Sequence, residues 1–151
     1  MTVQRSPRGC DFCRHDIPAA VVYPAESFIA VVVRADGTPA EDADGNPIPL
    51  QGLNGSWMAC TDCSILIDAD EWERLQDRYY AVTGHSRDQT EGMLLSLWWG
   101  FRRNRRGGPM PVSVLDDCTH PVTTWVKTNA NPEVVPGLTC LLCGDVLRRL
   151  Q

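Results

Sequence analysis

The spacing of the cysteines constrains this chain more than any other feature. Residues 10–15 read CDFCRH and residues 60–63 read CTDC, so four of the seven cysteines stand in two C-x-x-C pairs. Residues 140–143 contain a third pair, and the remaining cysteine begins the sequence CTH at residues 118–120. A C-x-x-C step allows two sulfurs from one tight turn to reach the same metal ion. An odd number of cysteines cannot pair completely as disulfides.

The count is resolved when His120 is added to the cysteines. Two groups of four then result, and every cysteine is used. The first group is Cys10, Cys13, Cys60 and Cys63, and the second is Cys118, His120, Cys140 and Cys143. Four cysteines, or three cysteines with one histidine, form the closed tetrahedral shell of a structural zinc site. We therefore predict two structural Zn²⁺ sites as the cofactors of this chain.

The sequence leaves alternatives open. Buried free cysteines, or disulfides within C-x-x-C pairs as in redox enzymes, would account for a single pair but fit three pairs poorly. In another grouping, Cys10 and Cys13 share a metal with Cys140 and Cys143. His15 follows Cys13 by two positions and competes as a ligand. Because four cysteines are available, we place His15 at the surface or behind the ligands.

Composition agrees with a small protein that needs such sites. The chain has 151 residues, and its short apolar runs form only a modest core, which favours a metal as an additional source of stability. Its net charge of −5 argues against general coating of nucleic acid, because such proteins usually carry a positive excess. No secretory signal or membrane-spanning run is visible, so we expect a soluble cytoplasmic protein. Thirteen arginines against one lysine are typical of a high-GC genome.

Local patterns in the first part of the chain predict an α+β fold. Short strands are predicted at residues 21–23, 28–34 and 57–60. Residues 28–53 have the turn signals of a hairpin with an exposed, proline-rich excursion. Residues 60–63 lead into an apolar segment, and a helix start there would favour thiolate charge. A cysteine knuckle, a hairpin and a second knuckle that leads into a helix make up the treble-clef arrangement.

The middle of the chain is predicted to form a helical hairpin. Asp68 is the expected N-cap of its first helix, with Glu71 three positions later, and Gly84 ends that helix. Ser86 begins the second helix with another capping box, and this helix runs to about Arg106. The apolar residues at helical spacing are Trp72, Leu75, Tyr79 and Val82 in the first helix and Met93, Leu94, Leu97, Trp98 and Phe101 in the second.

The last part of the chain is predicted to form a small zinc ribbon. Strands are expected at residues 123–127 and 138–140, on either side of a turn, and Cys143 with Gly144 ends the cysteine knuckle that follows. The expected organisation has three units. These are a treble-clef-like zinc unit with hairpin and helix at 1–84, an amphipathic helix with an arginine-rich end at 85–108, and the zinc-ribbon unit at 109–151.

The motifs resemble those of a known group of proteins. The pattern C-D-F-C followed by W-x-A-C-x-x-C resembles small zinc-binding proteins, of undefined role, from actinobacteria and their phages. The matching residues are Cys10, Asp11, Phe12, Cys13, Trp57, Ala59, Cys60 and Cys63. The tail, C-x-H followed by C-x-x-C-G, resembles short zinc ribbons frequent in phage proteins. This resemblance implies a cytoplasmic zinc protein of bacterial or phage origin. It does not imply any catalysed reaction.

The sequence offers little support for catalysis. A catalytic zinc keeps one position open for water, whereas both groups of four are closed. Residues 14–18 read RHDIP and resemble the D-H-I-x-P motif of HNH nucleases, which follows a C-x-x-C pair. Here His15 and Asp16 stand in the reverse order, and the later histidine, His85, falls in a turn between helices. We predict a protein without enzymatic activity, and an HNH-like nuclease is the least favoured alternative.

Aromatic and basic residues near the end of the second helix suggest a binding surface. The candidates are Trp99, Arg102, Arg103, Arg105 and Arg106. Arginines at a helix C-terminus also complement the helix dipole, so a purely structural role is the alternative. If Trp99 is partly exposed, the patch can contact phosphates or an acidic protein surface. Our first hypothesis is a non-enzymatic protein that binds a bacterial host protein of transcription or replication. Our second hypothesis is a nucleic-acid-binding protein that uses residues 102–106.

Overall fold

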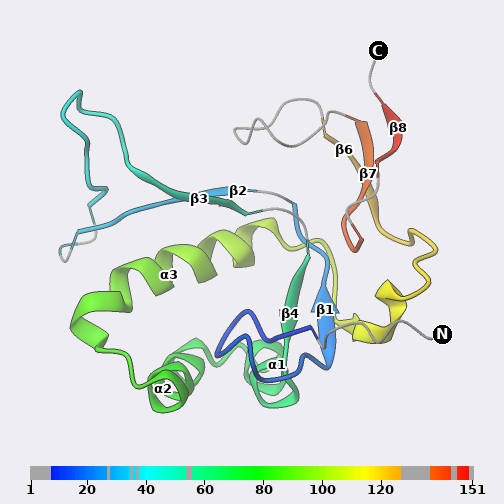
Figure 1. Ribbon diagram of the computed structural model, residues 1–151, viewed down its shortest axis with the longest axis horizontal. Helices are drawn as coiled ribbons and strands as arrows, with labels where there is room; N and C mark the ends of the chain where they lie inside the picture. The colour runs from blue at the N-terminus through cyan, green and yellow to red at the C-terminus, as the bar shows by residue number, and fades with distance from the viewer. Residues whose placement is uncertain are drawn as a thin grey trace.

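The computed structural model describes residues 8–26, 28–34, 36, 38–53, 56–126, 137–143 and 146–149. Within them the chain is a mixture of helix and sheet, as expected (Figure 1). The helices are α1 (Thr61–Asp68), α2 (Trp72–Thr83), α3 (Arg87–Asn104) and the short 3-10 helix η1 (Val112–Leu115). The strands are β1 (Val21–Tyr23), β2 (Phe28–Val31), β3 (Pro49–Leu53), β4 (Trp57–Ala59), β5 (Met110–Pro111), β6 (Thr123–Val126), β7 (Gly137–Cys140) and β8 (Val146–Arg149). Sequence analysis did not anticipate β8, and Gly144 lies outside the described residues.

The described strands form three small antiparallel sheets, with the orders β4-β1-β5, β2-β3 and β6-β7-β8. In the first sheet, Val22 of β1 pairs with Met58 of β4 on one side and with Met110 of β5 on the other. Figure 1 shows β1 and β4 side by side near the middle of the molecule. Because β5 lies beyond residue 108, this sheet joins segments that sequence analysis placed in different units. The division into three units stays a prediction.

Aromatic side chains from distant segments form the main core. The ring centroid of Phe12 lies 5.1 Å from that of Phe101 and 5.3 Å from that of Trp57. Phe12, Tyr23 and Phe101 are almost fully buried. Burial of one such side chain contributes about 1.5–3 kcal/mol. Since Phe12 lies inside the first C-x-x-C pair, the core also holds the first cysteine loop in place.

The junction between α1 and α2 differs from the prediction. Asp68 was the expected N-cap of a helix, but it is the last residue of α1, and α2 begins only at Trp72. The Asp68 carboxylate accepts a hydrogen bond of 2.9 Å from the Tyr23 hydroxyl, so it is used in a tertiary contact and not as a cap. Asp70 has a φ of 57°, which breaks the helical path between α1 and α2. Gly84 ends α2 in the left-handed conformation, as predicted.

α3 begins where it was predicted and ends slightly earlier. Ser86 occupies the N-cap position, but its side chain makes no capping hydrogen bond. The helix ends at Asn104 and not near Arg106, because Arg105 has an extended backbone. Arg105 forms an isolated antiparallel bridge with Ala25, which directs the chain back toward the β4-β1-β5 sheet.

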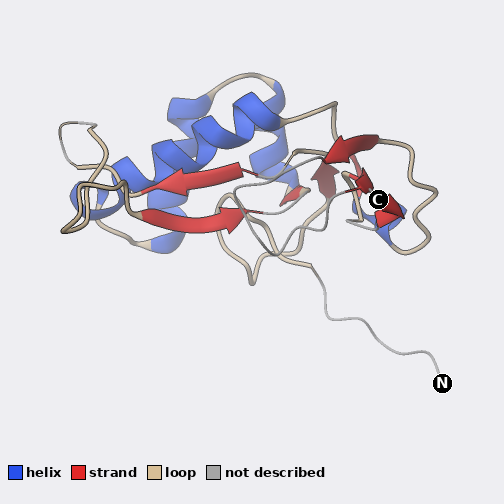
Figure 2. Ribbon diagram, turned by 90° about the horizontal axis from the view of Figure 1, so that it is seen from above, coloured by secondary structure: helices blue, strands red, loops and turns tan. Residues whose placement is uncertain are grey.

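The β2-β3 hairpin, which was predicted over residues 28–53, runs along α3 (Figures 1 and 2). Its close approach depends on small residues at every fourth position of the helix, which are Gly92, Ser96 and Gly100. A Cβ atom at Gly100 would lie 2.2 Å from the Phe28 ring. The Ser96 hydroxyl donates a hydrogen bond of 3.3 Å to the carbonyl oxygen of Val31. Sequence analysis gave these residues no role.

Candidate metal centres

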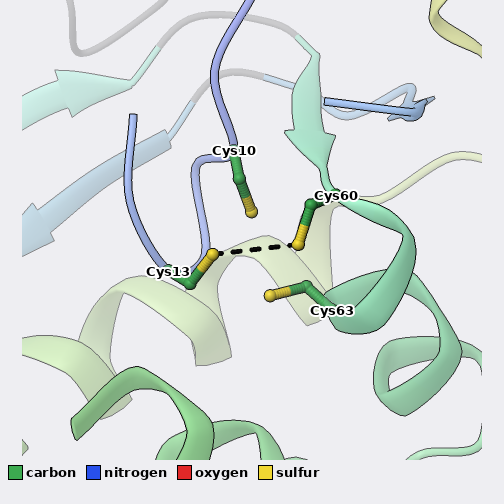
Figure 3. A group of neighbouring side chains, drawn as sticks. All are labelled: Cys10, Cys13, Cys60 and Cys63. Carbon is green, nitrogen blue, oxygen red and sulfur yellow. Dashed lines mark hydrogen bonds between the residues drawn. The ribbon is translucent and has the colours of Figure 1, made fainter. Parts of the chain in front are cut away.

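The first candidate centre contains four buried cysteines. Cys10 and Cys13 come from the loop before β1, whereas Cys60 is the N-cap of α1 and Cys63 lies in its first turn (Figure 3). Their side chains point toward one another, and the four sulfurs lie within 4.8 Å of each other. The Cys13 and Cys60 sulfurs are 3.8 Å apart. A tetrahedral shell with metal–sulfur bonds of about 2.3 Å has sulfurs about 3.8 Å apart. The group therefore has the dimensions of a metal site.

This arrangement removes two alternatives that the sequence left open. The grouping of Cys10 and Cys13 with Cys140 and Cys143 is wrong, because these pairs belong to separate clusters. The seven cysteines are free thiols. None of the three C-x-x-C pairs is therefore closed by a disulfide.

Asp11 joins the two cysteine loops of the first centre. Its backbone amide donates to the carbonyl oxygen of Met58 at 2.8 Å, and its carboxylate accepts from the amide of Met58 at 2.7 Å. Met58 lies in β4, two residues before Cys60. Burial of Asp11 raises the pKa of its carboxyl group. The residue inside the first C-x-x-C pair thus sets the distance between two ligand pairs that are fifty positions apart in sequence.

Hydrogen bonds among the thiols favour a cation at this group. The pKa of Cys10 is lowered to about 4, because the Cys63 thiol and nearby backbone amides stabilise its thiolate against the effect of burial. The pKa of Cys63 is raised by its hydrogen bond to Cys10 and by burial, and burial raises that of Cys13 to about 11. Without a cation, the crowded thiols cannot all lose their protons. A divalent ion removes this restriction, because a coordinating thiol is deprotonated.

Arg78 of α2 contacts the sulfurs of the first group. Its Nε atom lies 3.4 Å from the Cys63 sulfur, and one of its terminal nitrogens lies 3.6 Å from the Cys60 sulfur. The same guanidinium group lies 3.5 Å from Asp62, and the Arg78 side chain is 24% exposed. Hydrogen bonding to Cys63 raises the pKa of Arg78. Four thiolates around a bound dication would carry two net negative charges, and Arg78 would offset one of them.

Sequence reasoning missed Arg78. It lies fifteen positions after Cys63, and no motif marks it. The packing of α1 against α2 brings it to the sulfurs.

The second candidate centre contains the other predicted ligands. Cys118 and His120 follow η1, Cys140 ends β7, and Cys143 lies in the next turn. Their donor atoms lie within 4.8 Å of one another. The Cys118 and Cys140 sulfurs are 3.7 Å apart, and the Cys143 sulfur lies 3.3 Å from Nδ1 of His120. His120 has a left-handed φ of 55°. This group has the same dimensions as the first, with an imidazole in place of one sulfur.

Backbone amides prepare Cys140 for metal binding. Burial of Cys140 favours the neutral thiol and raises its pKa. Hydrogen bonds from the amides of Cys143 and Leu142 and from the side chain of His120 outweigh this effect of burial and lower the pKa of Cys140 to about 7. The amide of Leu142 lies 3.4 Å from the Cys140 sulfur. The turn after β7 therefore supplies both a ligand and the donors that stabilise a thiolate.

The second centre is attached to the rest of the molecule. Cys140 and Leu142 pack with Val22 of β1 in a second apolar cluster. The Ser56 hydroxyl, next to β4, donates to the carbonyl oxygen of Leu142 at 2.8 Å. Both metal groups thus lie next to the strands of the β4-β1-β5 sheet.

The predicted binding residues near the end of α3 divide into two sets. Trp99 is 57% exposed, and the guanidinium carbon of Arg103 lies 4.6 Å from the centroid of its ring. Arg102 lies 4.8 Å from the ring of Trp72 and 3.6 Å from Asp70. These three residues share one part of the surface.

The other two arginines make local contacts elsewhere. Arg105 is half-buried, and its guanidinium carbon lies 5.0 Å from the Tyr23 ring. Arg106 forms an ion pair with Glu26. Residues 102–106 therefore do not present four equivalent arginines to one ligand.

The two histidines that were weighed for catalysis line one cleft of about 600 Å³. The side chain of His15 is 85% exposed and lies 3.8 Å from the Asp11 carboxylate. Nδ1 of His85 lies 2.7 Å from the Tyr79 hydroxyl. Among the described residues, neither histidine belongs to a metal-binding group.

Known proteins supply no family for this chain. No protein-family model, curated protein or solved structure matches it. The resemblance to actinobacterial and phage zinc proteins therefore stays a prediction. In the part of the chain that the structure describes, no helix is long and apolar enough to cross a membrane.

Proposed function

We propose that both groups are structural zinc centres of a non-enzymatic interaction protein. The observation that carries this proposal is the completeness of each shell, since four protein donor atoms lie within 4.8 Å of one another in both groups. A catalytic zinc has three protein ligands and an open position. Tetrahedral sulfur shells suit zinc or iron, and three sulfurs with one imidazole are a common zinc set. Zinc binding at such a site contributes roughly 10–16 kcal/mol to folding.

The local folds support a treble-clef assignment for the first centre and a zinc-ribbon assignment for the second. Around the first centre, the cysteine loop at residues 10–13 precedes the β2-β3 hairpin, and the second pair lies at the start of α1. Around the second, the last pair lies at the end of β7 and in the following turn. Both assignments describe rigid scaffolds whose function depends on the surfaces that they carry.

The interaction proposal is supported by the exposed part of α3. Trp99 and the neighbouring Leu95 are 57% and 47% exposed. Large apolar side chains grouped at a surface mark protein interaction sites. The resemblance extends the proposal to a cytoplasmic protein, encoded by an actinobacterium or its phage, that binds a host protein of transcription or replication.

Nucleic-acid binding is the second candidate, and the stacking of Arg103 on Trp99 favours it. An exposed aromatic ring beside a cation can stack on a base and contact a phosphate. Against it stand the net charge of −5 and the contacts that occupy Arg105 and Arg106. Phosphate binding would weaken steeply with salt, and Arg103→Ala would lower the slope by about one.

Metal analysis of the purified chain tests the zinc proposal. We expect two zinc ions per chain, and a colourless protein, since iron in a sulfur shell is coloured. A chain without zinc whose circular dichroism is unchanged by a strong chelator would overturn the proposal. Cleavage of plasmid DNA with Mg²⁺ or Mn²⁺ that is lost in His15→Ala would overturn the non-enzymatic part.

A further inference from the structure

An apolar groove of about 570 Å³ lies between α3 and the β2-β3 hairpin. We call it the α3 groove, and its main lining residues are Val31, Val33, Trp72, Leu95, Trp99 and Arg102. The groove exists because the small residues of α3 bring the hairpin close, so that Val31 and Val33 form one wall and the next turns of the helix form the other. Its volume lies in the range of natural ligand sites and holds several apolar side-chain groups.

Two large apolar residues of the groove are exposed and lie next to each other. Leu95 and Trp99 are one turn apart on α3, and each leaves about half of its surface in water. Tryptophan and arginine are the residues most enriched at the centres of protein interfaces. Trp99 and Arg102 are thus the residues of the groove that match an interface centre, while Leu95 and the two valines add apolar contact area.

Two arginines bring positive charge to this groove, because Arg102 lines it and Arg103 stacks on Trp99, which also lines it. Arg102 and Arg103 are exposed and stack on Trp72 and Trp99, respectively. Arg102 has Asp70 at 3.6 Å, whereas Arg103 has no carboxylate partner within the described residues. The chain as a whole is acidic, so this charge is local. A complementary ligand therefore combines a large apolar group with a carboxylate.

We infer that the α3 groove binds a peptide segment of a partner protein, with a large apolar side chain beside Leu95 and Trp99 and an aspartate or glutamate at Arg103. The inference rests on the proposed interaction function and names the chemistry of the partner. A peptide fits better than a nucleic acid, because most of the lining is apolar and the nearby positive charge is limited to Arg102 and Arg103. A flat base could stack on Trp99 but would leave the valine wall without a contact.

Selection from a random peptide display library tests this inference, with the zinc-loaded full chain as bait. We expect the enriched peptides to contain Leu, Ile, Phe or Trp within a few positions of Asp or Glu. Trp99→Ala should weaken the selected peptides by about 30-fold or more, as for an interface hot spot. Arg103→Glu should weaken them about tenfold, with a larger effect at low salt.

Two variants serve as matched controls. Ile65→Ala removes an apolar side chain that is 59% exposed on α1, and Arg148→Glu reverses an exposed charge on β8. Both should leave peptide affinity within about twofold, since exposed substitutions away from a contact have small effects. Zinc content and circular dichroism of all four variants should match the unchanged chain.

Several outcomes would overturn the inference. These are the absence of enriched peptides, enrichment of basic peptides, and affinities that do not respond to Trp99→Ala. A concentration-dependent dimer that Trp99→Ala abolishes would also overturn it, because a second copy of the chain would then fill the groove. Displacement of the peptides by single-stranded DNA would do the same. If a partner protein is captured equally by the unchanged chain and by Trp99→Ala with Arg103→Glu, the interaction function stands and the groove is the wrong surface.

Discussion

Replacing Arg78 by alanine should weaken metal binding at the first centre and leave the second centre unchanged. The arginine donates to two ligand sulfurs, at 3.4 and 3.6 Å, and brings a positive charge to a centre with two net negative charges. Loss of a residue that hydrogen-bonds metal ligands typically weakens metal affinity by about 10–100-fold. This range corresponds to about 1.4–2.8 kcal/mol.

The structure places the expected effect toward the lower end of this range. Hydrogen bonds to charged groups contribute about 1.5–3 kcal/mol each when they are shielded from water. Arg78 is 24% exposed and is shared with Asp62, so water and the carboxylate already reduce its effect on the sulfurs. We therefore expect a loss of about tenfold for Arg78→Ala. The zinc affinity of Arg78→Lys should lie between that of the unchanged chain and that of Arg78→Ala, because lysine keeps the charge but lacks the fixed donor geometry of the guanidinium group.

Competition with a chromogenic chelator measures this loss, and the difference between the intact chain, where both centres titrate, and Cys118→Ser separates the two centres. In Cys118→Ser the second centre is incomplete, so chelator titration of that background reports the first centre alone. Arg74→Ala is the matched control, since Arg74 lies one turn earlier on α2, is 70% exposed and pairs with Glu71. Equal zinc affinity in Arg78→Ala and Arg74→Ala would refute the reasoning, and so would an equal loss at both centres.

Three further predictions concern the scaffold. Cys60→Ser should reduce the zinc content from two ions to one and unfold the surroundings of the first centre, whereas Cys118→Ser should remove only the ion of the second centre. Metal analysis with circular dichroism checks both expectations, and retention of two zinc ions by either variant would contradict them. Gly100→Ala should destabilise the fold by about 1–2 kcal/mol in urea unfolding, because a contact of 2.2 Å with the Phe28 ring puts overpacking in the upper part of its usual range of about 1–3 kcal/mol, and helix propensity returns up to about 1 kcal/mol. Gly108→Ala is its control and should be neutral or slightly stabilising, because a Cβ atom at Gly108 would meet open space. Equal changes in the free energy of unfolding for the two variants would show that the hairpin does not need Gly100. Tyr23→Phe should lower the free energy of unfolding by about 1 kcal/mol, because its hydroxyl bonds the carboxylate at the end of α1; an unchanged urea midpoint would contradict that role.

The metal ligands could be predicted because their signal is local. In a C-x-x-C pair, two ligands are brought together by the turn between them, so their spacing alone indicates the chemistry. The combination of pairs is not local, and the sequence left two groupings open. The sheet decides between them, because the pairing of β1 with β4 and the two hydrogen bonds of Asp11 to Met58 bring Cys60 to the first cysteine loop.

Element boundaries show the same division between local and distant causes. The left-handed glycine that ends α2 was predictable, since glycine adopts a positive φ without strain. The role of Asp68 was mispredicted, because its carboxylate bonds Tyr23 from a strand 45 residues earlier. Arg105 likewise leaves α3 to pair with Ala25. In both cases a contact between distant segments outweighs the local preference.

The sequence by itself determined the eight side chains that can bind metal, the strand and helix that flank the second cysteine pair, and the aromatic and basic residues near the end of α3. Only the tertiary structure decided which cysteine pairs share a centre, that Arg78 contacts the sulfurs of the first one, and that Trp99 lines a groove together with Arg102. The physical reason is the distance along the chain over which each interaction acts. Turn geometry and helical periodicity act over a few residues, whereas charge neutralisation and close packing depend on which distant segments meet.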